Sequence, residues 1–485
     1  MFLAKARYNR VKVGLFLGPA IFCLILFLAP PEGLSGDGWN AAAVVALMAT
    51  WWITEAIPIS ATALIPVVAF PLLGVVSLQD ATSPYADPII FLFMGGFLIA
   101  LSMQKWDLHR RIALYIIRCV GTSPAGLVGG FMIAAALLSM WISNTATALM
   151  LLPVGLSVVH LAERTPGFSK QSVFPVVLLL GIAYGCNIGG MATIIGTPPN
   201  ALLAGFIKQE YGTDISFVKW MMVGVPLLLV SLPLAYFILI RVSFSLKITD
   251  LVGVDDLVAT EVHQIGRMSR EEMAVALVFS GTALLWIFRP LLMNLIPGLS
   301  DAGIAMLGGL ILFLIPSSSR QGEFLLDWET ARRLPWETLI LFGGGLSLAS
   351  AFTKTGLSTW IGVLLQGAGS LPIVVVVLIT SSVIIFLTEL TSNTATTATL
   401  LPVVAALAVA IGHDPMLLAV PAVLSASCAF MLPVATPPNA IVYSSNRVSI
   451  PQMARAGIIL NFVFIGVITM LGLTLVRWVF GTALP

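Results

Sequence analysis

Long runs of apolar residues, separated by short polar stretches, follow one another along the whole chain. A run of about 20 apolar residues is long enough to cross a bilayer as an α-helix. The pattern predicts an all-α polytopic membrane protein whose first run is a retained transmembrane helix. The candidate segments are 13–30, 39–57, 58–75, 88–118, 125–162, 173–206, 217–240, 272–289, 301–315, 337–368, 371–411, 416–446 and 456–478.

Two of these segments, 125–162 and 371–411, are too long for one helix and have polar centres. Each predicts two half-length helices that meet at a tip, which is a re-entrant hairpin. Backbone of that kind persists at membrane depth only where protein or water satisfies its polar groups. With both segments taken as hairpins, the prediction is eleven transmembrane helices plus two re-entrant hairpins.

Basic residues indicate the orientation. With the N-terminus in the cytoplasm and each span crossing once, 19 of the 24 Lys and Arg residues fall on the cytoplasmic side. Cytoplasmic loops carry such an excess. We therefore predict a multi-pass protein of the cell (inner) membrane with a cytoplasmic N-terminus and a solvated, charged cytoplasmic loop at 241–271.

Composition excludes several classes of protein. The chain is 58% apolar and 9% charged, whereas soluble domains average about 45–50% apolar and about 25% charged residues. A soluble enzyme, a disordered chain and a secreted disulfide scaffold do not fit these values. The net charge of +2 is too small to indicate a nucleic-acid partner. The lipid bilayer is the expected partner.

The chain contains an internal repeat. The matching pairs are FLFMGGF (91–97) with ILFGGGL (340–346), SNTATALMLLP (143–153) with SNTATTATLLP (392–402), and GTPPNA (196–201) with ATPPNA (435–440). Between the two copies of the first element the chain crosses the membrane five times, so the second copy is inverted. Inverted repeats are typical of secondary transporters, whose site lies at the midplane where the repeats meet.

The repeated motifs have the chemistry of a polar site. Ser, Asn and Thr favour helix starts, so the two SNT triplets (143–145 and 392–394) end one half-helix and cap the next. Their amides and hydroxyls supply donors for a carboxylate and acceptors for a cation. Each TPPN (197–200 and 436–439) breaks its span and starts a half-helix, because Pro fits only the first position of a helix. The free N–H groups there form an anion site.

What the motifs lack constrains the substrate. No Lys or Arg lies near any of the four motifs, so a dianion would meet only dipoles, amides and hydroxyls. Burying two negative charges without countercharge is costly. A co-bound Na⁺, held by hydroxyl, amide and carbonyl oxygens, would offset much of this cost. The sequence contains no GxxxxGK[ST] motif, so nothing in it indicates that ATP drives transport. The residues therefore predict cation-coupled anion transport.

Two carboxylates, Glu55 and Glu389, stand within apolar segments. Either could carry a coupling proton. The repeat partner of Glu389 is Met140, so this glutamate is not part of a symmetric site. We favour a structural or gating role for both.

At this point the chain resembles the divalent anion:sodium symporter family, the INDY-type dicarboxylate transporters. The resemblance covers nearly the whole chain. It is carried by SMWISNTATALMLLPV (139–154), ATIIGTPPNA (192–201), FLTELTSNTATTATLLPV (386–403) and CAFMLPVATPPNA (428–440).

The resemblance implies a homodimer that works as an elevator. A scaffold domain (1–120 and 243–368) would hold the dimer interface, and a transport domain (121–242 and 369–485) would carry the substrate. Two Na⁺ sites or more are implied. The implied sodium ligands are Ser139, Ser143, Asn144 and Gly196 for one site, and Thr388, Thr391, Asn393 and Ala435 for a second, with backbone carbonyls contributing. The implied substrate contacts are Asn144, Thr145, Thr197, Pro198, Asn393, Thr394, Thr436 and Pro437. Thr391 stands where relatives often carry a small apolar residue, a harmless change if the position contributes only its carbonyl.

Three functions remain open at this point. The leading one is Na⁺-coupled symport of C4-dicarboxylates such as succinate, malate and fumarate. The second keeps the fold but exchanges dicarboxylates without sodium, or carries citrate or sulfate. The third is a membrane-embedded enzyme that uses Glu55 or Glu389 as acid or base. We predict that the chain is not an enzyme, because the sequence contains no nucleophile–base pair or metal cluster.

Overall fold

The protein is described by a computed structural model over residues 2–121, 123–164, 172–246, 254–320, 322–365, 367 and 370–481. Within these residues the chain is helical, apart from turns, loops and one isolated bridge between Pro316 and Phe324. Seven of the described helices are long and apolar enough to cross a membrane. The predicted all-α membrane architecture is therefore confirmed, while the full count of eleven spans and two hairpins stays a prediction.

The helices follow the predicted segments closely. The first half of the chain forms α1 (Phe2–Phe27), α2 (Gly36–Thr54), α3 (Ile59–Thr62), α4 (Ile65–Leu72), α5 (Leu78–Thr82), η1 (Ser83–Ala86), α6 (Pro88–Lys105), α7 (Leu108–Val120), α8 (Pro124–Ser139), α9 (Asn144–Arg164), α10 (Phe174–Gly190), α11 (Pro198–Tyr211), α12 (Phe217–Phe237) and the π-helical η2 (Ile238–Ser243). The second half forms α13 (Val254–Ile265), α14 (Arg270–Leu292), α15 (Asp301–Leu314), α16 (Trp328–Ala331), α17 (Trp336–Lys354), α18 (Leu357–Leu364), α19 (Ile373–Thr388), α20 (Asn393–Ala410), α21 (Met416–Ala426), α22 (Pro437–Ser444) and α23 (Ile450–Phe480).

Some predicted segments are divided in ways that periodicity alone does not predict. The run 58–75 forms the two short helices α3 and α4, and the run 88–118 breaks between α6 and α7, where Asp107 adopts a left-handed conformation. The predicted loop 241–271 is partly wrong, because residues 254–265 form α13. This helix packs against α7, and Arg110 forms an ion pair of 2.8 Å with Glu261.

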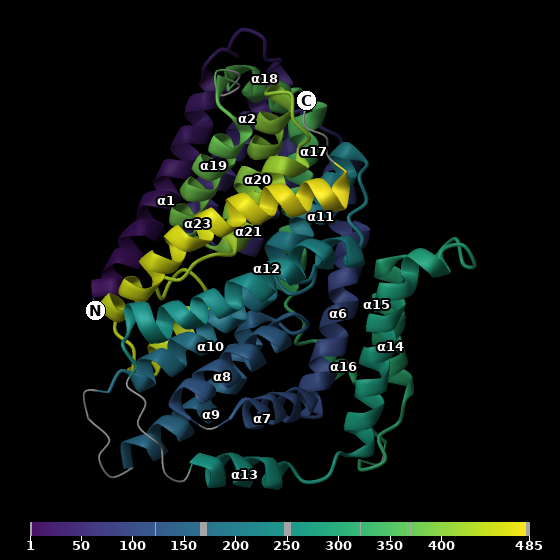
Figure 1. Cartoon of the computed structure of the whole chain (residues 1–485). Helices are drawn as coiled ribbons and strands as arrows, with labels where there is room; N and C mark the ends of the chain where they lie inside the picture. The colour runs from purple at the N-terminus through teal and green to yellow at the C-terminus, as the bar shows by residue number, and fades with distance from the viewer. Residues whose placement is uncertain are drawn as a thin grey trace.

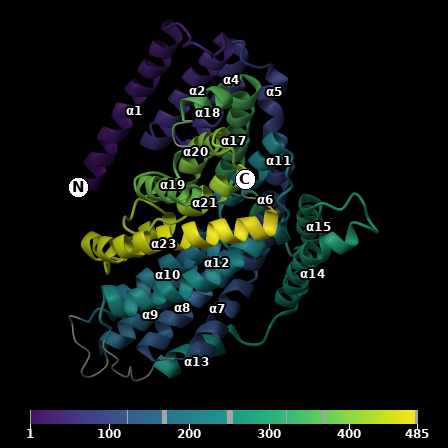
Figure 2. The same cartoon turned by 45° about the horizontal axis from the view of Figure 1, so that its top comes forward.

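The two repeats pack on each other in a reciprocal way. The counterparts in the two repeats are α9 with α20, α10 with α21, and α11 with α22. In the second repeat α22 contacts α9 and α10, and in the first repeat α11 contacts α20 and α21 in the same way. The counterparts α12 and α23 contact each other directly. In Figures 1 and 2, α23 lies next to α12, and α12 lies next to α10. Each half-helix that follows a break therefore lies against helices of the other repeat, as expected for a pseudo-twofold arrangement.

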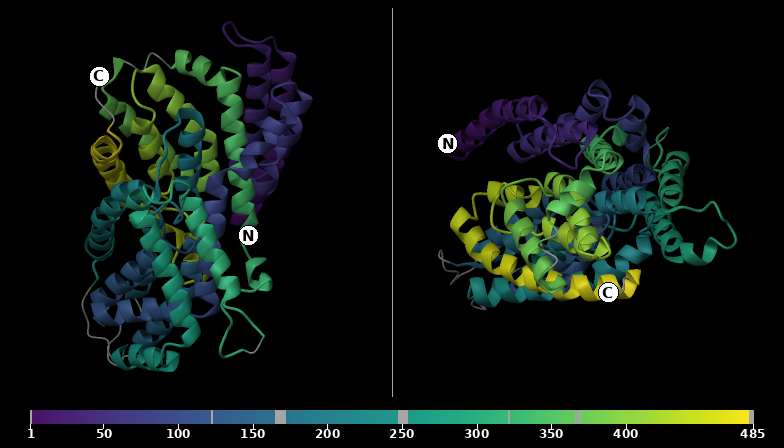
Figure 3. Two further views of the ribbon diagram at one scale, coloured as in Figure 1. Left: turned by 90° about the vertical axis from the view of Figure 1, so that its right-hand side faces the viewer. Right: turned by 90° about the horizontal axis from the view of Figure 1, so that it is seen from above.

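Other helices lie at the edges of this core. α1 packs mainly on α2, while α14 packs on α15 and α15 packs on α6. Seen from above, α1 and the α14–α15 pair occupy well-separated edges of the molecule (Figure 3).

Helix α10 is buried over its whole length and positions the first break. It packs tightly on α8, where a Cβ atom at Gly189 would collide with the backbone of Ala136. Small residues permit such close approach between helices in membranes. The contact fixes the end of α10 beside the end of α8, which is where the first polar site begins.

Candidate functional site

The first SNT motif lies at the start of α9, where the chain turns from α8, as predicted. α8 ends at Ser139 and α9 begins at Asn144. The Ser143 hydroxyl accepts a hydrogen bond of 3.3 Å from the N–H of Ala146, so it caps the second helix. Local side-chain chemistry therefore ends one helix and starts the next at this tip.

The first break lies between α10 and α11. Thr197 is extended and α11 begins at Pro198, as the TPPN motif predicts, although the Thr197 side chain makes no capping hydrogen bond. The Asn200 amide instead braces the unwound segment, donating to the carbonyl oxygens of Gly190 at 3.2 Å and Thr193 at 2.8 Å. The Thr193 hydroxyl donates to the carbonyl of Met140, which ties the break to the first tip.

Oxygen atoms gather where this tip meets this break. A Cβ atom built on Gly190 would lie 2.7 Å from Asn144 Oδ1 and 3.1 Å from the Gly196 carbonyl oxygen. One built on Gly196 would lie 2.9 Å from the Ser139 carbonyl oxygen. Within the described part of the chain, Asn144 Oδ1 and Ser139 Oγ are buried without a hydrogen-bond partner. Such hard oxygen atoms, left unsatisfied, suit a small cation.

The second SNT motif also lies where one helix ends and the next begins, but side chains in and around it are hydrogen-bonded to one another. α19 ends at Thr388 and α20 begins at Asn393. The Thr388 hydroxyl contacts Asn393 Oδ1 at 2.8 Å and the Ala426 carbonyl at 2.9 Å. The Thr391 hydroxyl is hydrogen-bonded to Thr396 and to the Leu387 carbonyl. Its side chain is thus already engaged, which leaves the backbone carbonyl of Thr391 as the group to offer a cation.

The second break repeats the brace of the first. The Asn439 amide donates to the carbonyls of Ala429 and Leu432, each at 3.1 Å, as Asn200 does to the corresponding positions 239 residues earlier. Thr436 is the N-cap of α22, and its hydroxyl accepts from the N–H of Asn439.

One further polar residue joins the two repeats. Asn187 of α10 donates to the Ala429 carbonyl at 3.1 Å and to the Thr436 hydroxyl at 3.2 Å. Sequence reasoning missed it, although an amide inside a wholly apolar helix is a signal. Asn187 thus ties α10, the helix that leads to the first break, to the second break.

The predicted anion contacts lie at the first turns of four helices or just before them. Asn144 and Asn393 start α9 and α20, while Pro198 and Pro437 start α11 and α22. Their burial differs, since Thr197 and Thr436 are buried, Thr145 and Thr394 are half-buried, and Pro437 is exposed.

One statement from the sequence is corrected. A basic residue does lie at a motif, because Arg10 of α1 donates through Nη1 to the carbonyl of Leu390 at 2.9 Å. Its Nη2 pairs with Glu55 at 3.0 Å. The contact spans 380 residues of chain and arises only from the fold. Because Glu55 balances the guanidinium, the pair adds little net charge at the second tip.

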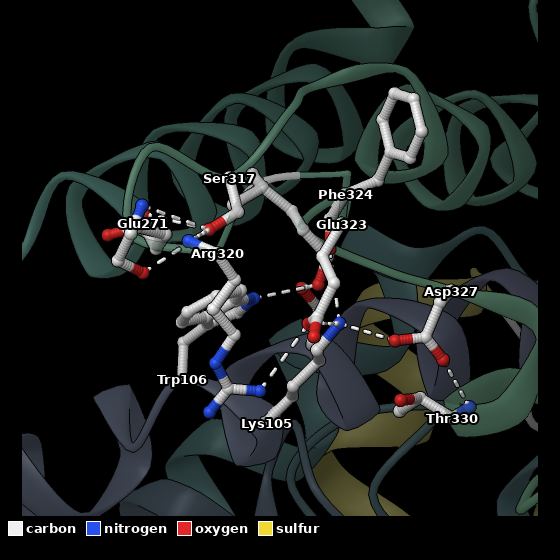
Figure 4. Close-up of polar contacts among 12 residues, drawn as sticks. Lys105, Trp106, Glu271, Ser317, Arg320, Glu323, Phe324, Asp327 and Thr330 are labelled. Atoms are coloured by element: carbon white, nitrogen blue, oxygen red, sulfur yellow. Dashed lines mark hydrogen bonds and ion pairs between the residues drawn. The ribbon is translucent and has the colours of Figure 1, made fainter.

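A separate charged cavity of about 530 Å³ lies at the C-terminal end of α6, away from the motifs. Figure 4 shows two of its cations already engaged: Lys105 contacts Asp327 and Glu323, and Arg320 lies over the ring of Trp106. The hydrogen bond from Lys105 lowers the pKa of Asp327 to about 2. This cluster is a structural feature of the loop that leads to α17.

The pKa of Asp327 predicts a pH-dependent contribution to stability. Because its pKa is lower in the folded protein than the unfolded value of about 3.9, the contribution is full above pH 4 and is lost as pH falls toward 2. We expect Asp327→Asn to lower the free energy of unfolding by at most about 1 kcal/mol at pH 7, since the pair is partly exposed. Thermal unfolding in detergent should show a deficit at pH 7 that shrinks by pH 2.5. An equal deficit at both pH values would contradict this assignment.

Comparison with known proteins identifies the family of this chain. Residues 10–482 match the family described as the sodium:sulfate symporter transmembrane region. The sodium-dependent dicarboxylate transporter SdcS of Staphylococcus saprophyticus is 43% identical over 99% of this chain and 95% of its own length. SdcS of Staphylococcus aureus strain USA300 is 40% identical over 93% of this chain and 88% of its own.

Two solved transporter structures share the fold. The YdaH transporter of Alcanivorax borkumensis superposes with a TM-score of 0.60 at 15% identity, covering 92% of this chain and 99% of its own. MtrF of Neisseria gonorrhoeae, described among antimetabolite efflux pumps, has a TM-score of 0.60 at 12% identity and covers 96% and 98%. The family and these relatives are transporters rather than enzymes. The chain therefore belongs to the sodium:sulfate symporter family, the divalent anion:sodium symporters.

Proposed function

We propose that this protein couples sodium entry to the uptake of C4-dicarboxylates such as succinate, malate and fumarate across the cell (inner) membrane, with its N-terminus in the cytoplasm. Sodium-dependent dicarboxylate transport itself follows from its family and its near-full-length relatives. The observation that carries the proposal is the first tip, where the unsatisfied Asn144 Oδ1 faces gathered backbone carbonyls.

In this proposal sodium and substrate share the tips. One Na⁺ lies among Ser139, Ser143, Asn144 and Gly196, and a second among Thr388, Thr391, Asn393 and Ala435. The two cations offset the charge of the dicarboxylate, which lies against the helix starts that contain Thr145, Thr197, Pro198, Thr394, Thr436 and Pro437. Helix N-termini favour anions. Support comes from the oxygen-rich first tip and from the lack of an unbalanced basic group at either tip among the described side chains.

We also propose that the tips and breaks move as part of a transport domain (121–242 and 369–485) against a scaffold (1–120 and 243–368) within a homodimer. The elevator and the dimer are implied by the family resemblance. The reciprocal packing of α8–α12 with α19–α23 supports the transport domain as one body. The position of α1, α14 and α15 at the edges supports their place in the scaffold.

Uptake of radiolabelled succinate into proteoliposomes tests this function. We expect uptake with an inward Na⁺ gradient and none above background with matched K⁺. Equal uptake in both, stimulated by internal dicarboxylate, would instead identify a sodium-independent exchanger. Competition by unlabelled malate, fumarate, citrate and sulfate distinguishes the substrates, and inhibition by citrate or sulfate alone would contradict the C4-dicarboxylate assignment.

A further inference from the structure

The buried carboxylate of Glu389 holds the second break. Oε1 accepts hydrogen bonds from the N–H groups of Phe430 at 2.7 Å and Met431 at 2.9 Å, and Oε2 accepts from Met431 at 3.0 Å and Leu432 at 3.1 Å. The Asn461 amide of α23 donates to Oε1 at 2.8 Å. Three successive N–H groups in an unwound segment form an anion-binding concavity, and here the chain fills that concavity with its own side chain.

Among its described residues, the first repeat has no such arrangement. Met140 stands where Glu389 stands in the second repeat. The N–H groups of Met191 and Ala192, which correspond to those of Phe430 and Met431, bond to nearby carbonyls of α10 at 3.3 and 3.0 Å. The first break therefore closes on itself through local turns, whereas the second break depends on a carboxylate from the hairpin tip.

The second break is thus fixed from both sides of its backbone. Glu389 holds the N–H groups, while Asn439 binds the carbonyls of Ala429 and Leu432 and the Tyr184 hydroxyl binds that of Phe430 at 2.7 Å. Glu389 also directly follows Thr388 in the chain. The same carboxylate therefore sets the position of the tip relative to the segment that leads to Ala435.

We propose that Glu389 is a positioning residue for the second sodium site, which it also provides with a buried negative charge. It joins the tip that contains Thr388 and Thr391 to the break that contains Ala435, so the carbonyls from both sides meet around one cation. Its five hydrogen bonds come from neutral N–H donors, so its charge is not cancelled by any of them. The inference rests on the sodium sites proposed above.

Sodium activation of succinate uptake in Glu389→Gln tests the proposal. Glutamine keeps the size but removes the charge and turns an N–H donor toward Met431 or Leu432. Loss of an outer-shell partner of a bound metal costs about 10–100-fold in affinity. We therefore expect the Na⁺ concentration for half-maximal uptake to rise about tenfold or more, while the KM for succinate at saturating Na⁺ changes by less than about threefold.

Further variants separate positioning from general damage. Glu389→Asp keeps the charge and should restore part of the sodium affinity. Met140→Leu, a volume-conserving change at the corresponding position of the first repeat, should leave sodium activation as in the wild type. If Glu389→Gln does not assemble, Asn461→Leu removes one donor and keeps the charge, and should raise the half-maximal Na⁺ concentration by about two- to tenfold, as loss of one hydrogen bond does.

Two outcomes would overturn the inference in distinguishable ways. If Glu389→Gln or Asn461→Leu lowers uptake equally at every Na⁺ concentration, Glu389 is only a structural residue. If wild-type uptake needs no sodium, the proposed function fails and the second sodium site with it.

Discussion

Asn144→Ala is expected to abolish sodium-driven succinate uptake. Asn144 Oδ1 is a buried acceptor that lacks a hydrogen-bond partner within the described chain, and it lies beside the carbonyls near Gly190 and Gly196. Removing it takes away a direct ligand, so the loss should exceed the roughly 10–100-fold that an outer-shell change costs. Initial uptake rates in proteoliposomes, normalised to the amount of reconstituted protein, measure the effect.

Asn393→Ala should also abolish uptake, but it has a second consequence. Asn393 Oδ1 is bonded to the Thr388 hydroxyl at 2.8 Å, so its removal leaves a buried hydroxyl with one partner fewer. We expect this variant to lose about 1 kcal/mol of stability as well, which Asn144→Ala should not. Thermal unfolding of the two purified variants separates these effects.

A matched control for both variants is Asn40→Ala. Asn40 lies in α2, outside the motifs, and donates to the Leu73 carbonyl at 3.2 Å. The Asn40→Ala variant should retain most of the succinate uptake. Full activity in both Asn144→Ala and Asn393→Ala would refute the assignment of the tips as the site.

Local chemistry explains why the helix ends at the site could be predicted. Proline fixes the start of α11 and α22, and asparagine after serine fixes the start of α9 and α20. These preferences act within a few residues and need no tertiary structure. Because each motif occurs twice in the same order, the chain also indicated which positions correspond.

Contacts between distant segments could not be predicted in this way. Arg10 meets Leu390 only because α1 lies against α2, and α2 packs near α20. Glu389 finds its partners only once residues 430–432 have unwound and α23 has brought Asn461 beside them. In the sequence, Glu389 differs from a solvated residue only by its apolar surroundings, and Arg10, among other basic and polar residues, does not differ at all.

The two repeats therefore differ more in structure than their motifs suggest. The first tip has an amide oxygen that finds no partner among the described residues, whereas the second is internally bonded and has a buried carboxylate behind it. Equal motifs thus support two cation sites that need not bind sodium equally well.

The glycine at position 196 offers a direct test of the first cation site. A Cβ atom there would lie 2.5 Å from the Gly190 carbonyl oxygen and 2.9 Å from that of Ser139. Gly196→Ala should therefore push apart the oxygens that would surround sodium. We expect uptake at physiological Na⁺ to fall more than about 100-fold, beyond the cost of an outer-shell change, as measured by sodium-dependent uptake.

The second repeat contains the matched control, because Ala435 occupies the corresponding position and already has a Cβ atom. Ala435→Gly leaves its carbonyl in place and adds only backbone freedom, which costs about 0.5–1 kcal/mol, or about two- to fivefold in affinity. A small effect of Ala435→Gly beside a large effect of Gly196→Ala would show that steric room for a cation, rather than flexibility of the break, sets activity. Normal sodium activation in Gly196→Ala would mean that the oxygens near Ser139 and Asn144 do not bind the ion. In that case the coupling cation must be held at the second tip alone.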